Sequence, residues 1–173
     1  MRVVEGLATV VDVDDFVARI GDVGDEHDCV VQAFDARYVV DRAHLETAVR
    51  QAARAWERDE AVARDPAVEV LLYAAGRRQI SEALTMGVGE GETPVVAVVV
   101  SGFPDDPLAT DEPEAAAAED LAAMLDSAET LGEAADEDRI YEFFEVGEAE
   151  RAATDATLSD LVRERAVLLT VNK

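Results

Sequence analysis

The sequence predicts an α/β fold, organised as a single domain with a small mixed β-sheet of about four strands flanked by six or seven helices. Short valine-rich segments of strand length, such as residues 94–100, are separated by longer segments in which apolar residues recur at helical spacing. The chain has 173 residues, of which 49% are hydrophobic, so it is long enough to bury one core. Because neither a repeat nor an interdomain linker interrupts it, we expect residues 1–173 to form one domain.

The N-terminal part of the chain predicts two strands with a helix between them. Residues 3–11 are apolar at both ends and predict the first strand. Asp14 is expected to cap a short helix over residues 15–20, which the glycine-containing segment 21–24 would end. Residues 29–34 predict a second strand, which we place in the centre of the sheet because most of its residues are apolar.

Two helices are predicted next. Residues 42–63 predict a long helix, because four apolar residues recur on one of its faces. Asp65 and Pro66 mark the start of another helix, since aspartate caps helix N-termini and proline fits the first helical position. That helix, residues 67–75, is nearly all apolar and should be buried, and Gly76 is a suitable C-terminal stop. The apolar stripe of the long helix consists of Leu45, Val49, Ala52 and Trp56.

The second half of the chain predicts the most buried strand and an acidic region. A helix over residues 77–86 is expected to end at Gly87, before the most apolar run of the sequence, residues 94–100, which suits the middle of a sheet. Residues 104–138 carry thirteen acidic groups and no basic one, and predict a loop followed by an alanine-rich helix over 114–127. The remaining predicted elements are two short helices, 137–144 and 157–165, and a closing strand, 166–171.

The charge of the chain indicates adaptation to salt. The net charge is −24, with 39 acidic residues, and the single lysine is Lys173. A carboxylate-rich and lysine-poor surface is typical of proteins from a very salty, halophilic cytoplasm. At molar ionic strength the Debye length is about 3 Å, so these carboxylates repel one another only weakly. We therefore interpret the acidity as an adaptation to solvent rather than as a sign of a basic partner.

Several classes of protein are excluded by composition. The single cysteine, Cys29, excludes an internal disulfide, and together with two histidines it leaves too few ligands for a structural zinc site. No apolar run approaches the 18 residues or so of a membrane span, and no signal peptide is evident at the N-terminus. We expect a cytoplasmic protein that does not associate with membranes.

The sequence contains no complete catalytic motif, so we expect no enzyme activity, no metal and no cofactor. Residues 87–91 resemble a dinucleotide-binding loop, but they precede a strand instead of joining a strand to a helix. Cys29 is expected to be a small buried hydrophobe, and neither His27 nor His44 has an evident nucleophile as partner. An acidic cluster could hold a divalent ion, although a solvated helix cap is the favoured interpretation; its members are Asp12, Asp14 and Asp15.

The distribution of arginine is the informative anomaly. Residues 37–78 contain eight of the fourteen arginines and seven acids, a local net charge of +1 against −25 for the rest of the chain. Three of these arginines are spaced four residues apart and should share one helix face, roughly opposite Leu45 and Trp56. The alternative is a solvated face on which they pair with Glu46 and Glu57. The three are Arg50, Arg54 and Arg58.

A second basic feature follows the predicted helix break at Gly76. If Arg77 opens the next helix, unpaired backbone N–H groups, a positive dipole end and the guanidinium groups of Arg77 and Arg78 together form an anion site suited to phosphate. The alternative is two exposed arginines after a helix break. The nearby aromatic residues could offer stacking surfaces, although core packing is the better interpretation for Phe34; they are Phe34, Tyr38 and Tyr73.

These segments resemble a known family. Residues 31–36 and, more specifically, residues 67–80 with Ala83 and Gly87 are similar to the smallest subunit of the archaeal and eukaryotic KEOPS complex, the family of the human PRPK-binding protein. The likeness covers most of the chain and is weak across residues 104–135. The most specific matches are Glu69, Leu71, Leu72, Tyr73, Gly76, Arg78, Gln79 and Ile80.

The resemblance implies a non-catalytic subunit of the complex that installs threonylcarbamoyl on adenosine 37 of tRNA. Members of the family bind the N-terminal lobe of the complex's small atypical kinase and capture tRNA, chiefly at its 3′ CCA end. The kinase-contacting surface cannot be placed from the motif. The implied tRNA-binding residues are Ala75, Gly76, Arg77, Arg78, Gln79 and Ile80, of which Arg77 occupies a position expected to vary, and Arg50, Arg54 and Arg58 are added on the basis of charge.

Two other functions stay open at this point. The Arg77–Arg78 site could serve an enzyme that takes a small phosphate-bearing ligand, although no general base or nucleophile lies near it in the sequence. Alternatively, the chain is an acidic assembly protein whose arginines have no specific role.

Overall fold

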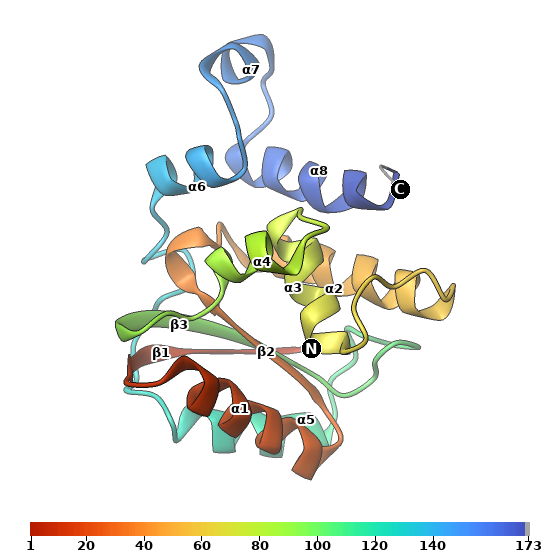
Figure 1. Ribbon diagram of the computed structural model, residues 1–173, viewed down its shortest axis with the longest axis vertical. Helices are drawn as coiled ribbons and strands as arrows, with labels where there is room; N and C mark the ends of the chain where they lie inside the picture. Colours follow the sequence, from red (N-terminus) through yellow and green to blue (C-terminus); the bar gives the residue numbers. More distant parts are fainter. Residues whose placement is uncertain (172–173) are drawn as a thin grey trace.

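A computed structural model describes residues 1–171 and arranges them in layers (Figure 1). A small sheet occupies the middle, with α1 and α5 on one side and α2, α3 and α4 on the other (Figure 1). Helices α6 and α8 lie beyond α2 and α3, and α7 forms the tip of the molecule (Figure 1). Two apolar clusters, one on each side of the sheet, make up the core.

The sheet contains three strands within residues 1–171, in the order β1-β3-β2, and both pairings are antiparallel. The strands are β1 (Arg2–Val10), β2 (Val30–Asp35) and β3 (Gly91–Val100). In the register, Ala97 of β3 stands opposite Val4 of β1 and Ala33 of β2. The central position of β3 agrees with the prediction from its continuous apolar run, because both of its faces are covered by helices.

The α/β class is therefore confirmed, whereas three details of the predicted sheet are wrong. The sheet is not mixed, and the strand predicted for residues 29–34 forms an edge instead of the centre. The closing strand predicted for residues 166–171 belongs to α8 (Leu158–Val171). A six-residue apolar run does not distinguish a strand from a helix by periodicity, and here the buried residues Leu161, Val162 and Ala166 lie on one side of a helix.

Helix α1 (Val13–His27) is much longer than predicted. Its N-cap is Asp12, not Asp14, and it continues through Gly21 and Gly24. Gly24 completes a buried row with Phe16 and Ile20, and a Cβ atom at this position would lie 2.7 Å from the carbonyl oxygen of Cys29. Glycine is thus required here for close packing, and it does not end the helix.

Helices α2 and α3 carry the candidate site and follow the prediction more closely. Helix α2 (Arg42–Glu57) starts where expected and ends six residues earlier than predicted, and the predicted stripe is buried except for the half-buried Trp56. Helix α3 (Pro66–Ala75) has the predicted bounds, with the Asp65 carboxylate accepting from the Ala67 N–H at 2.8 Å. Gly76 ends it in the left-handed conformation, with φ 61°.

The remaining helices differ from the prediction mainly in their bounds. The helix predicted for residues 77–86 is only a short turn, α4 (Ile80–Ala83), followed by a 3₁₀ turn at Leu84–Met86. One short helix was not predicted, so residues 1–171 contain eight α-helices instead of six or seven. None of the helices in this part of the chain is long and apolar enough to cross a membrane. The three helices not yet given are α5 (Glu112–Ala122), α6 (Glu137–Phe143) and α7 (Glu148–Ala153), and α7 is the one that was not predicted.

Candidate functional site

Two arginines within α2, Arg50 and Arg54, and a third at its C-cap, Arg58, lie on the exposed side of this helix. The buried residues of the helix, including Leu45 and Val49, point towards α3 and α8, and the three arginines occupy the opposite side. Successive members are separated by a rise of about 6 Å, one turn of the helix. Within residues 1–171 none of them forms an ion pair, and Glu46 pairs instead with Arg42 at 2.9 Å. The row therefore presents three solvated guanidinium groups, those of Arg50, Arg54 and Arg58.

Gly76, which follows α3, has a structural role at the end of that helix. Its N–H donates to the Tyr73 carbonyl at 3.2 Å and the Arg77 N–H donates to the Leu72 carbonyl at 3.0 Å, so both amides close the end of α3. A Cβ atom at position 76 would lie 3.0 Å from the Cβ atom of Arg165 in α8. Both the left-handed conformation and the contact with α8 favour glycine here.

The predicted anion site at a helix start is wrong. Helix α4 begins at Ile80, three residues later than expected, and has only four residues. The Arg77 amide is used by α3, and no helix begins at Arg77 to direct a dipole at its side chain. This removes the main argument for an enzyme that binds a phosphate-bearing ligand at Arg77 and Arg78.

The Arg77 side chain is held by the end of α6. Its guanidinium group donates to the Phe143 carbonyl, pairs with Glu145 at 3.1 Å and lies 5.2 Å from the centre of the Phe143 ring. Arg165 of α8 acts beside it, donating to the Phe144 carbonyl at 3.2 Å and pairing with Glu150 at 2.8 Å. Two cations thus meet the carbonyl end of α6, where the helix dipole favours positive charge. Sequence reasoning missed the partners of Arg77, because they lie more than sixty residues away along the chain.

The other residues of the predicted site differ in exposure. Ala75 is buried in the core, whereas Arg78 and Gln79 are exposed on the loop between α3 and α4. Ile80, the first residue of α4, is 44% exposed. The loop therefore places a guanidinium group, an amide and an apolar side chain next to one another on the surface.

The aromatic residues near the site offer little stacking surface. Phe34 is fully buried, as expected, and Tyr73 is also buried, with its hydroxyl 3.3 Å from the Thr170 hydroxyl. Tyr38 is half-buried and contacts the Phe143 ring at 5.3 Å. None of these three rings is positioned to stack on a base.

Two buried polar residues, Glu69 of α3 and His44 of α2, hold the segments around α3 in place. The Glu69 carboxylate accepts from the N–H groups of Val62 and Ala63, at 3.1 and 2.8 Å, and so holds the loop that precedes α3. His44 of α2 donates through Nε2 to the Ala74 carbonyl at 2.8 Å, and its Nδ1 faces the Val40 N–H. Burial lowers the pKa of His44, so the imidazole is neutral and connects α2 to the end of α3.

Two other candidates from the sequence, Cys29 and the acidic cluster at residues 12–15, are explained by their surroundings in the structure. Burial, together with nearby carboxylates, raises the pKa of the Cys29 thiol to about 11, which makes the thiolate scarce at neutral pH. Asp12 of the acidic cluster is a helix cap that accepts from the Asp15 N–H at 2.9 Å. One group that sequence reasoning missed could hold a metal ion, because α5 brings Asp120 to the end of α1; ligand atoms of Glu26, His27 and Asp120 lie within 4.8 Å of one another.

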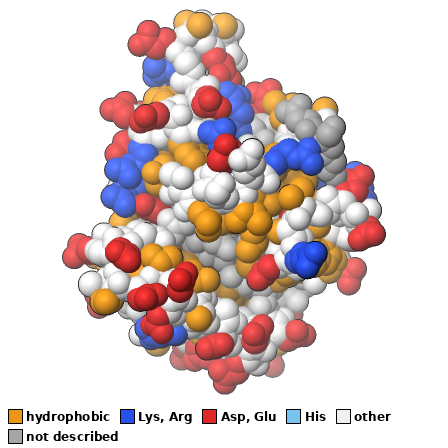
Figure 2. Space-filling model, in the orientation of Figure 1, with side chains coloured by type: hydrophobic (Ala, Val, Ile, Leu, Met, Phe, Trp, Pro, Cys, Tyr) orange, Lys and Arg blue, Asp and Glu red, His pale blue; other side chains and the backbone are white. Residues whose placement is uncertain are grey.

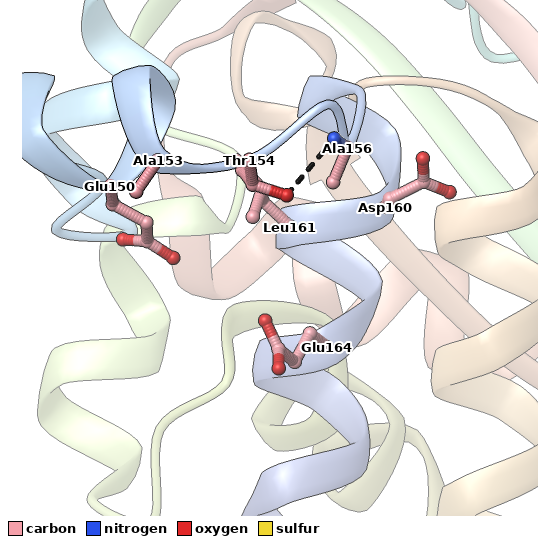
Figure 3. A pocket seen from close by; sticks show the side chains of 7 residues that line it. All are labelled: Glu150, Ala153, Thr154, Ala156, Asp160, Leu161 and Glu164. Atoms are coloured by element: carbon pink, nitrogen blue, oxygen red, sulfur yellow. Dashed lines mark hydrogen bonds between the residues drawn. The ribbon is translucent and has the colours of Figure 1, made fainter.

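A hollow of ≈ 520 Å³ between α7 and α8 is unsuited to nucleic acid (Figure 3). Three of the seven residues that line it carry carboxylates, namely Glu150, Asp160 and Glu164. Hydrogen bonds lower the pKa of Glu150, chiefly from Arg165, and that of Asp160, chiefly from the Thr157 backbone. Both groups are therefore charged and would repel a phosphate.

Comparison with known proteins identifies a family whose sequence pattern matches most of the chain. The family described as "Kinase binding protein CGI-121" matches residues 10–169. This range runs from the end of β1 to within α8 and includes all of the candidate residues above. No curated protein matches the chain.

Proposed function

Because the chain belongs to the CGI-121 family of kinase-binding proteins, we propose that it is a non-catalytic subunit of the KEOPS complex, which installs threonylcarbamoyl on adenosine 37 of tRNA. In this function it binds the atypical kinase of the complex and the 3′ CCA end of tRNA, in the cytoplasm of a halophilic archaeon. The family match over residues 10–169 carries the proposal.

The loop between α3 and α4 supports the tRNA-binding part. A single-stranded 3′ end exposes its bases and its phosphates, and proteins read it through hydrogen bonds to base edges, apolar contacts and charge. Arg78 and Gln79 supply exposed donors, and Ile80 supplies an apolar surface for a base. Arg77 has a positioning role in this arrangement, because its guanidinium group is committed to the end of α6.

The arginine row of α2 supports the same function through charge. Arg50, Arg54 and Arg58 lie on a surface that is otherwise strongly acidic, and their guanidinium groups are solvated. In dilute buffer a protein of net charge −24 would repel tRNA. In molar salt this repulsion is screened, so short-range contacts such as those of arginine with phosphate decide the affinity.

The test compares Arg78→Glu with Arg19→Glu in molar KCl. Arg19 is also exposed, but it lies on α1, on the other side of the sheet. Arg78→Glu should weaken binding to intact tRNA about tenfold or more, because a carboxylate replaces a donor of charge-assisted hydrogen bonds. The control variant should bind like the parent.

tRNA trimmed of its CCA end serves as the second ligand. The parent should bind trimmed tRNA weakly, and Arg78→Glu should change that weak binding little. Unchanged kinase binding reports that the variant is folded. If Arg78→Glu binds intact tRNA as tightly as the parent does, the assignment of the 3′ end to this loop is wrong.

A further inference from the structure

The outer edge of β2 is open. Strand β2 pairs with β3 on one side, and no strand within residues 1–171 pairs with its other side. Helix α1 covers one face of the sheet and α3 covers the opposite face (Figure 1). An unpaired strand edge presents backbone N–H and C=O groups that can pair with another extended chain.

Three connected hollows follow this edge. Their volumes are ≈ 400, ≈ 300 and ≈ 360 Å³, in order from the end near Gly87 to the end near Phe103. The first two share Val31 among their lining residues, and the second and third share Val30. We name this continuous feature the β2 furrow. It accompanies residues 30–33 of β2, about 13 Å of extended chain.

The widest part of the β2 furrow is apolar. Phe16 and Ile20 of α1 form one wall, and Val68 and Leu71 of α3 form the other. Two large apolar residues stand at its rim, Val17 at 52% exposed and Leu84 at 58%. Figure 2 shows hydrophobic side chains gathered near the middle of this face of the molecule. Exposed apolar surface of this kind in a chain so rich in carboxylates marks an interaction site.

The polar groups of the β2 furrow limit what can bind there. Among the described residues that line it are four aspartates and one basic residue, Arg64. The aspartates disfavour a phosphate backbone, and they also disfavour a second copy of this acidic chain. The acidity of the chain as a whole is interpreted as salt adaptation, but aspartates beside an apolar hollow fit an extended peptide in which basic residues flank apolar ones better than one flanked by acidic residues. The four are Asp14, Asp25, Asp28 and Asp65.

The edge itself is covered by one local contact. The Gln32 side-chain amide donates to the Ala33 carbonyl at 2.7 Å, within the strand that lines the furrow. A side-chain amide can rotate away at low cost, so this contact shields the edge without closing it to a partner.

We propose that the kinase docks in the β2 furrow through an extended segment with alternate apolar residues and flanking lysine or arginine. The segment pairs with the backbone of β2 as an added strand, its apolar side chains enter the hollow between α1 and α3, and its basic residues face the aspartates. This inference rests on the proposed function, which supplies the kinase as partner.

The test measures binding of the kinase from the same organism to three variants in molar KCl. Leu84→Glu and Val17→Glu place a carboxylate at the rim of the furrow, and each should weaken kinase binding about tenfold or more. Val11→Glu is the matched control, because Val11 is 88% exposed and does not line the furrow; it should bind like the parent. Thermal unfolding of each variant checks the fold.

Hydrogen exchange locates the contact independently of mutation. The amides of residues 30–35 should gain protection when the kinase binds. Parent-like affinity of both rim variants, or protection that appears only on other elements, overturns the furrow and leaves the proposed function standing. Loss of tRNA binding with kinase binding intact also overturns it, because the furrow would then serve RNA. If the parent itself does not bind the kinase, the proposed function fails together with this inference.

Discussion

Replacing Arg77 with alanine should destabilise the fold, although the residue lies in the segment that the family resemblance implies for tRNA binding. The side chain joins the end of α3 to the end of α6 through the Phe143 carbonyl, the Phe143 ring and the Glu145 carboxylate. It is 25% exposed, so these contacts are partly shielded from water. Arg77→Ala removes all three contacts at once.

The size of the effect follows from the contacts. A hydrogen bond that involves a charged group contributes about 1.5–3 kcal/mol. The ion pair adds about 0–1 kcal/mol, because Glu145 is 77% exposed and salt screens the pair. The cation–π contact adds about 0.5–1 kcal/mol, but neighbouring contacts are not additive and water can reach the freed carbonyl. We therefore expect Arg77→Ala to lower the free energy of unfolding by about 2 kcal/mol.

Urea unfolding in molar KCl measures this loss, because urea is uncharged and leaves the ionic strength constant. Arg54→Ala is the matched control, since Arg54 is exposed and forms no ion pair within residues 1–171; it should change stability by less than about 0.5 kcal/mol. Glu145→Gln, which removes the ion pair alone, should reproduce only the small ion-pair part of the loss. If Arg77→Ala costs no more than Arg54→Ala, the contacts with α6 do not stabilise the fold and the positioning role of Arg77 is wrong.

Three further predictions concern pH, salt and catalysis. Burial lowers the pKa of His44 in the folded protein, so the unfolded chain takes up a proton first as the pH falls. The parent should therefore keep its full stability advantage over His44→Gln above about pH 6.5. Below that pH the advantage should shrink, by up to about 1.4 kcal/mol per pH unit. A constant advantage from about pH 7 to about pH 5 would show that His44 is not held neutral. The unfolding midpoint should rise as KCl increases from about 0.1 to about 3 M, because screening relieves the repulsion among 39 acidic residues; a flat or falling series contradicts the interpretation of the charge as salt adaptation. The purified chain should neither hydrolyse ATP nor transfer threonylcarbamoyl, and either activity in the absence of other proteins would refute the non-catalytic role that we propose.

The parts of the fold that depend on local chemistry could be predicted from the sequence. Asp65, Pro66 and Gly76 determine the ends of α3, because capping, a fixed φ and a left-handed residue act within one turn. The shared face of the α2 arginines followed from their spacing alone. The continuous apolar run of β3 placed it in the centre of the sheet.

The parts that depend on tertiary contacts could not be predicted. Gly24 lies within α1 because the Cys29 carbonyl leaves no room for a side chain, and glycine alone reads as a helix stop. The edge position of β2 depends on which strand pairs with which, and an apolar strand does not reveal this. Arg77 resembled an anion-binding residue because its partners, Phe143 and Glu145, belong to a distant segment of the chain.

Binding of the purified protein to the atypical kinase of its own organism tests the central claim most directly. The two proteins, mixed in molar KCl and separated by sedimentation with and without intact tRNA, should migrate together as a complex. Addition of tRNA should shift that complex further, and tRNA trimmed of its CCA end should not. If the protein and the kinase sediment separately under conditions in which both are folded, this chain is not the kinase-binding subunit that its family indicates.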